Sequence, residues 1–169
     1  MKRSININAL TRPIIQTMQA YRSARLEFVE SDREMILLDA NENPFDTGLN
    51  RYPDPMQTKL KERLGSVKHV DPSNIFLGNG SDELISLMMV AFCEPKKDEV
   101  LLVPPTFGMY QVSANLNGVD TVEVPLIADF QLNVPEILAR ATDHTKLVFI
   151  PTPNNPTGNR FPMKDLKAI

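Results

Sequence analysis

The segment VLLVPPTF, at residues 100–107, gives the most direct indication of the fold class. Its apolar run VLLV is typical of a strand that is covered on both faces in a parallel sheet. Pro104 and Pro105 end this strand, because proline cannot donate to a strand ladder. A second segment of the same kind, LVFIPTPNNPTG, occupies residues 147–158. We therefore expect buried parallel strands that run directly into loops rich in proline and asparagine.

Further strands and helices alternate along the chain. Apolar runs predict two more strands, at residues 75–77 and 119–124, beside those at 100–103 and 147–150. The helical spacing of apolar residues predicts helices at residues 14–22, 56–67, 82–92, 107–116 and 135–141, and another from residue 162. This alternation indicates an α/β fold with a mainly parallel sheet and flanking helices.

The composition separates an arm from a domain. Residues 1–35 are polar with scattered apolar positions, and we expect an N-terminal arm there. Residues 36–169 carry the strand and helix pattern, after a stretch rich in asparagine, aspartate and proline that predicts irregular structure. The helix from residue 162 has no stop signal before the sequence ends, so we expect an incomplete domain, cut inside a fold.

Bulk composition excludes several classes of protein. Hydrophobic residues make up 42% and charged residues 23% of the 169 residues, which is ordinary for a soluble globular protein. The net charge of −3 and the lack of a basic run argue against a nucleic-acid partner. No apolar stretch approaches the roughly 20 residues of a membrane span, and no secretory signal is visible. A cytoplasmic protein is expected.

The single cysteine and the two histidines suggest no metal site. Cys93 lies in the apolar run LISLMMVAFC, where a small buried hydrophobe is the favoured interpretation. One cysteine forms neither a disulfide framework nor a cysteine-based metal site. His69 and His144 stand apart from each other and are expected at the surface.

Three of the predicted strands run into unusual loops. In open parallel sheets, ligands bind beyond the carboxyl ends of the strands. The loops GNGSD (78–82), PPTF (104–107) and PTPNNPTG (151–158) follow the strands at 75–77, 100–103 and 147–150. We expect these loops to converge on one edge of the sheet and to form the ligand site there.

The loop GNGSD has the features of an anion site. A helix that begins near Ser81 presents free backbone N–H groups, and its dipole favours a negative ligand. Gly80 lets the backbone approach closely, and a phosphate could lie on the N–H groups of Gly80, Ser81 and Asp82. Asp82 and Glu83 must then turn away from it. The alternative is a plain glycine turn with Ser81 as the N-cap.

The other loops offer an aromatic ring and an amide. Phe107 could stack on a flat ligand or could be a core aromatic residue. Asn155 could donate a hydrogen bond to a ligand oxygen, or the cluster could be a turn-and-cap loop. Asn41 in LDANENP, Tyr52 in RYPDP and Tyr21 are weaker signals taken alone.

Taken together and in this order, the motifs resemble the fold type I aminotransferases, which use pyridoxal phosphate. LDANENP, RYPDP, GNGSDELI, AFCEPKKDEV, PPTFGMY and PNNPTG are similar to those of the histidinol-phosphate aminotransferase branch. The resemblance runs from about Tyr21 to Ile169 and implies that residues 36–169 are the N-terminal part of the large, cofactor-binding domain.

The resemblance implies a role for each motif residue around the cofactor. Ser81 and Asp82 would donate backbone N–H groups to its phosphate, and Gly80 would shape the turn. Phe107 would stack on the pyridine ring, where the family often has tyrosine, so that a phenol hydroxyl is missing here. Asn155 would hydrogen-bond the phenolic oxygen of the ring and lie beside the substrate.

Other residues would act near the substrate or across a dimer interface. Tyr52 would reach the cofactor phosphate of the other subunit of a homodimer, and Tyr21 and Asn41 would lie near the substrate. The Schiff-base lysine of the family is absent from this chain, because Lys164 and Lys167 lie at the start of a polar helix. No catalytic residue is therefore assigned here, and the chain alone is expected to be inactive.

The implied reaction is the pyridoxal-phosphate-dependent transamination of histidinol phosphate with 2-oxoglutarate, a step of histidine biosynthesis, carried out by the longer protein. Small-molecule partners, namely an amino donor and a phosphorylated substrate, are implied as well. The alternatives are another fold type I aminotransferase, a phospho-amino-acid decarboxylase, or a non-catalytic truncated fragment. The specificity residues of the family lie beyond Ile169.

Overall fold

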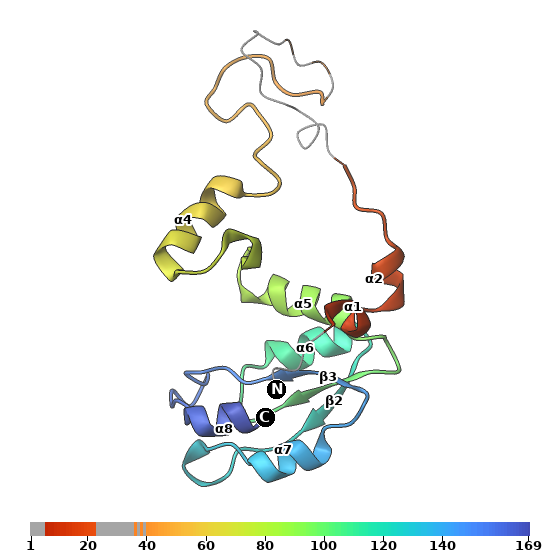
Figure 1. Cartoon of the computed structure of the whole chain (residues 1–169), viewed down its shortest axis with the longest axis vertical. Coiled ribbons are helices and arrows are strands. Elements are labelled where there is room, and N and C mark those ends of the chain that lie inside the picture. The colour runs from red at the N-terminus through yellow and green to blue at the C-terminus, as the bar shows by residue number, and fades with distance from the viewer. Residues whose placement is uncertain (1–5, 23–35, 37, 39) are drawn as a thin grey trace. The chain divides into compact units, whose positions relative to one another are not determined.

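A computed structural model describes residues 6–22, 36, 38 and 40–169 of the chain. These residues divide into two compact units (Figure 1). The larger unit comprises Met1–Met18 and Gly78–Ile169, and the smaller unit comprises Gln19–Leu77. The predicted division at residue 35 into an arm and a domain remains a prediction, and residues 1–5 and 23–35 of that arm lie outside the described part of the chain.

A parallel sheet forms the centre of the larger unit. Its strands are β1 (Glu99–Leu102), β2 (Asp120–Glu123) and β3 (Thr145–Phe149), in the order β2-β1-β3. Both neighbours of β1 run parallel to it, and Leu101 lies between Val122 and Val148. The predicted strands at 100–103, 119–124 and 147–150 are confirmed, each within a few residues of its predicted bounds.

The apolar run that begins in β1 is buried on both faces of the sheet. Val100 and Leu102 belong to one core cluster, with residues of α5 (Ser81–Phe92) and α6 (Met109–Leu116). Leu101 and Val103 belong to a second cluster, which also contains a residue of α7 (Val134–Arg140). A residue of α8 (Met163–Ala168) packs against this cluster. Successive side chains of a strand point to opposite faces, so helices cover both sides of the sheet (Figure 1).

The helices of the larger unit begin where local chemistry permits. The Asn133 side chain caps α7 by accepting the backbone N–H of Glu136, and Pro135 stands in the first turn, where its missing N–H costs nothing. Pro162 is the N-cap residue of α8. Cys93 is buried against the sheet, as predicted, and His69 and His144 are exposed.

The N-terminal segment of the larger unit lies against the end of α5. It holds α1 (Ile7–Leu10) and α2 (Pro13–Thr17), so the helix predicted at 14–22 extends five residues too far. Arg12 joins the segment to α5, because its guanidinium donates to the Val90 carbonyl at 2.9 Å and pairs with Glu94 at 3.2 Å. A cation is favourable at a helix C-terminus, where carbonyls lack partners.

The smaller unit contains α4 (Thr58–Lys68) and the 3₁₀ turn η1 (Pro72–Asn74). The helix predicted at 56–67 is confirmed, with its start shifted to Thr58. Gly65 is buried, and a Cβ atom there would lie 2.7 Å from the carbonyl oxygen of Val70. The chain can turn closely into η1 because that position has no side chain.

The predicted strand at residues 75–77 is wrong, because these residues form no strand in the structure. A strand exists only where a neighbouring strand accepts and donates its backbone hydrogen bonds. All three strands of the described residues belong to the larger unit, whereas residues 75–77 close the smaller one. The apolar run is therefore extended but unpaired. Among the described residues, no helix is long and apolar enough to cross a membrane.

Candidate functional site

The loops that follow β1 and β3 meet at one edge of the sheet. The two strands are parallel neighbours, so their carboxyl ends lie side by side. Asn154 joins the loops: its side-chain amide donates to the Pro105 carbonyl at 3.0 Å and to the Thr157 hydroxyl at 2.6 Å. The hydroxyl of Thr106 donates to the Asn154 side chain at 3.3 Å. The predicted convergence of these two loops is confirmed.

Asn154 and Asn155 have different environments. Asn154 is only 3% exposed, and its backbone is held by Asn159 at 2.8 Å and by Gly158 at 2.7 Å. Asn155 is exposed. The tight turn closed by Gly158, at φ +73°, buries the first asparagine and presents the second. Sequence reasoning missed Asn154, because two adjacent asparagines in a turn give no signal of which one faces inward.

The third loop leads into α5. The short connection of residues 93–98 reverses the chain between α5 and β1, so the N-terminus of α5 lies toward the carboxyl ends of the strands. Gly80 is the N-cap residue, at φ +82° and ψ 170°, and no side chain caps the helix. Ser81 is already helical. Ser81 is therefore not the N-cap residue that the alternative expected, and the first turn of α5 has no side-chain cap.

One acidic side chain of this turn is held by the loop before the helix. The Glu83 carboxylate folds back and accepts the backbone N–H of Asn79. The Glu83 side chain is therefore turned toward the loop before the helix, as expected. Asp82 and Ser81 are exposed at the helix start. An exposed hydroxyl and uncapped N–H groups at the positive end of a helix dipole suit an anion.

Phe107 is half-buried in a row of aromatic rings. Its ring meets Tyr110 edge-on with centroids 5.6 Å apart, and Tyr110 stacks on Phe149 at 4.6 Å. All three rings pack against the core cluster that contains residues of α5. Phe107 therefore contributes to the core, which was the alternative to stacking on a ligand. Burial raises the pKa of the Tyr110 phenol. Tyr110 did not stand out in the sequence, because its spacing is that of a core helix residue.

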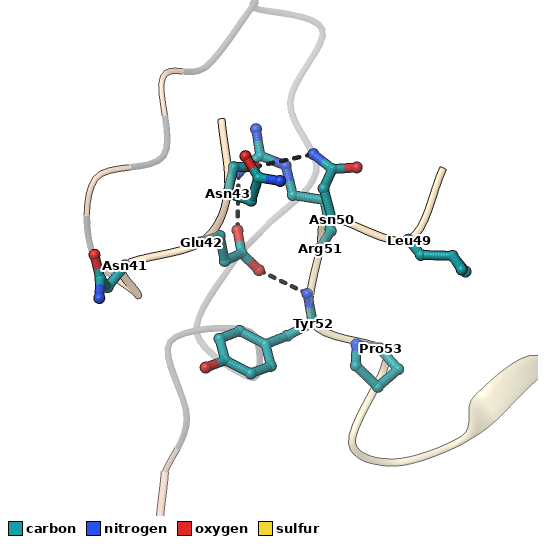
Figure 2. A pocket seen from close by; sticks show the side chains of 8 residues that line it. All are labelled: Asn41, Glu42, Asn43, Leu49, Asn50, Arg51, Tyr52 and Pro53. Atoms are coloured by element: carbon teal, nitrogen blue, oxygen red, sulfur yellow. Dashed lines mark hydrogen bonds and ion pairs between the residues drawn. The ribbon is translucent and has the colours of Figure 1, made fainter. Parts of the chain in front are cut away.

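The remaining candidates belong to the smaller unit. Asn41 and Tyr52 line one open hollow of about 360 Å³ (Figure 2), together with Glu42, Asn43, Leu49, Asn50, Arg51 and Pro53. Asn41 has a φ of +51°, which asparagine tolerates better than most residues. The Tyr52 side chain is 62% exposed and Tyr21 is 88% exposed. Tyr21 is not among the described residues that line this hollow, so its role remains a prediction.

The family model for aminotransferase class I and II matches residues 33–169. The chain belongs to the aminotransferase class I and II family. Members of this family depend on pyridoxal phosphate, and the α/β fold with a parallel sheet is the one predicted. The chain therefore carries part of an aminotransferase fold.

Curated relatives of this aminotransferase chain carry a more specific name. It is 48% identical to a histidinol-phosphate aminotransferase of Christiangramia forsetii over 167 residues, which cover 99% of this chain and 48% of that protein. It is 52% identical to the histidinol-phosphate aminotransferase of Flavobacterium psychrophilum, over 94% of this chain and 46% of that protein. The chain thus spans about half the length of these relatives.

A solved structure shows the same fold. The N-succinyldiaminopimelate aminotransferase of Mycobacterium tuberculosis superposes with a TM-score of 0.62 at 28% identity, over 72% of this chain and 34% of that one. The aminotransferase fold is therefore shared with proteins whose names give other substrates.

Proposed function

We propose that this chain is the N-terminal part of a histidinol-phosphate aminotransferase that transfers the amino group between histidinol phosphate and 2-oxoglutarate in histidine biosynthesis. The junction made by Asn154 carries the proposal, because it holds the loops of Phe107 and Asn155 together at the carboxyl ends of β1 and β3. The choice of substrate is supported by the names of relatives that share about 50% sequence identity with the chain.

The start of α5 fits the phosphate of pyridoxal phosphate. Its first turn has no side-chain cap, and Ser81 and Asp82 are exposed there. We assign the backbone N–H groups of Ser81 and Asp82 and the hydroxyl of Ser81 as phosphate donors. Gly80 holds the turn in a conformation that other residues rarely adopt.

Phe107 and Asn155 suit the planar ring of the cofactor. The Phe107 ring would lie against the pyridine face, and the exposed amide of Asn155 would donate to the ring oxygen and lie beside the substrate. When bound, pyridoxal phosphate supplies the electron sink that amino transfer needs. The residues of this chain would orient the ring and anchor its phosphate.

Residues of the smaller unit would complete the site in a dimer. We assign the Tyr52 phenol to the cofactor phosphate of the partner subunit of a homodimer, and Asn41 and Tyr21 to the substrate. The exposed Tyr52 side chain supports a contact outside its own unit. A cytoplasmic location belongs to the same proposal.

The lysine that holds the cofactor covalently would come from outside this chain. Lys164 and Lys167 are exposed on α8, and Leu166 of that helix packs on the opposite face of the sheet from α5. Neither lysine is thus placed beside the proposed phosphate site. We propose that the chain alone does not catalyse amino transfer.

An absorbance spectrum of the purified chain with pyridoxal phosphate, before and after borohydride, tests this assignment. We expect the spectrum of the free aldehyde and no lysine-containing peptide that carries reduced cofactor in mass spectrometry. A reducible band on one specific lysine would contradict the proposal. In the full-length protein, amino transfer from histidinol phosphate to 2-oxoglutarate is expected, with aromatic amino acids as the comparison substrates.

A further inference from the structure

A buried carboxylate joins the two motif segments of the smaller unit. Glu42 Oε1 accepts the backbone N–H of Tyr52 at 2.8 Å, and Glu42 Oε2 accepts Nη1 of Arg51 at 3.0 Å (Figure 2). The Glu42 side chain is 2% exposed, whereas that of Arg51 is 45% exposed. The carboxylate therefore lies inside the turn, and its cationic partner lies at the surface.

A third hydrogen bond runs between the same segments. The side-chain amide of Asn50 donates to the backbone carbonyl of Asn43 at 3.1 Å. Residues 41–43 and 50–52 are thus tied at two places, and Asn41 and Tyr52 line the same hollow. The distance between Asn41 and Tyr52 depends on these hydrogen bonds, because the loop between the two residues contains no helix or strand.

Because the Glu42 carboxylate is buried, it needs hydrogen-bond donors at fixed positions. An ionised carboxylate is costly to bury unless it is paired and hydrogen-bonded, so the turn must keep both donors in place. The contact holds the backbone of Tyr52 and leaves its side chain exposed. The phenol is thus anchored at its base and remains available to a ligand.

We propose that Glu42 is a positioning residue: its carboxylate holds the Tyr52 backbone so that the phenol can donate to the cofactor phosphate. The inference rests on the proposed function, in which Tyr52 binds that phosphate. Glu42 itself does not touch the cofactor. Replacing Glu42 should therefore weaken binding of the cofactor phosphate only by displacing Tyr52. It should not affect binding of the rest of the cofactor.

The test measures reconstitution of the full-length apoprotein with pyridoxal phosphate and with pyridoxal, which lacks the phosphate. We expect Tyr52→Phe and Glu42→Ala each to weaken pyridoxal phosphate binding by about tenfold or more, as for a lost hydrogen bond to a charged group. The double variant should be no weaker than Tyr52→Phe alone, because the two residues act as one unit. Pyridoxal affinity should stay unchanged in all three.

Two further variants separate positioning from general damage. Glu42→Gln keeps an oxygen for the Tyr52 N–H and loses the ion pair, so it should restore most of the pyridoxal phosphate affinity. Glu62→Ala removes an exposed carboxylate from α4 of the same unit and should change neither affinity. Circular dichroism of each variant would serve as the control for correct folding.

Several outcomes would overturn the inference. Equal losses for pyridoxal phosphate and pyridoxal in Glu42→Ala would indicate general damage, and additive losses in the double variant would indicate independent action. Unchanged affinity in Tyr52→Phe would remove both the role of Tyr52 and this inference, while the proposed function stands. Failure of the wild-type apoprotein to bind pyridoxal phosphate would instead remove the proposed function.

Discussion

The side-chain amide of Asn154 donates a hydrogen bond to the carbonyl oxygen of Pro105 at 3.0 Å, across 49 residues of sequence. This bond links the loop after β3 to the loop after β1, at the edge where parallel sheets bind ligands. The position of Phe107 relative to Asn155 therefore depends on a residue that would touch neither ring nor substrate.

Replacing Asn154 should destabilise the protein more than replacing its neighbour. Asn154→Ala removes a buried side chain that donates to the Pro105 carbonyl and to the Thr157 hydroxyl, so we expect the free energy of unfolding to fall by about 2 kcal/mol or more. Asn155→Ala removes an exposed side chain and should change stability by less than about 0.5 kcal/mol, while weakening cofactor binding. Urea unfolding of both variants checks this, and equal midpoints would contradict it.

A glycine pair tests the backbone at the proposed phosphate site. Gly80, at φ +82° and ψ 170°, occupies a region that is open almost only to glycine, so Gly80→Ala should cost about 1–3 kcal/mol. Gly108→Ala is the matched control, because its φ of −63° suits alanine, and it should be neutral or slightly stabilising. Neither added Cβ would meet an atom within 4 Å, so thermal unfolding reports the backbone effect.

Two adjacent methionines of α5 test the core beneath the site. Met89 is 0% exposed against the sheet, and Met89→Ala should lower the free energy of unfolding by about 2–5 kcal/mol through lost burial and a cavity. Met88 is 44% exposed, and Met88→Ala should cost far less. Comparable losses in urea unfolding would mean that α5 does not pack on the sheet as described.

The buried thiol should make stability depend on alkaline pH. Burial, followed by the negative charge of Asp98, raises the pKa of Cys93 from 9.0 to about 11. The unfolded thiol thus ionises at lower pH than the folded thiol, so its contribution is present below pH 9.0 and is lost as pH rises toward about 11. The unfolding free energy should fall more steeply over this range in the wild type than in Cys93→Ala. Parallel curves would contradict the prediction.

Local chemistry made much of the fold predictable. The apolar run at 100–103 indicated a strand covered on both faces, and Val100 and Leu101 do point into different cores. Helices at 56–67, 82–92 and 135–141 followed from spacing and end signals, because both act within a few residues along the chain. The candidate loops followed from their place after apolar runs.

The sequence by itself determined most of the helices and strands, and which loops carry the polar residues, since these depend on near neighbours. Only the tertiary structure decided that residues 75–77 form no strand, that Asn154 is buried while Asn155 is exposed, and that Glu42 holds Tyr52. Each of these depends on a hydrogen-bond partner that is distant in the chain or on the direction in which a turn buries a side chain. The local sequence specifies neither the distant hydrogen-bond partner nor the direction of burial, because both are set only when the chain has folded.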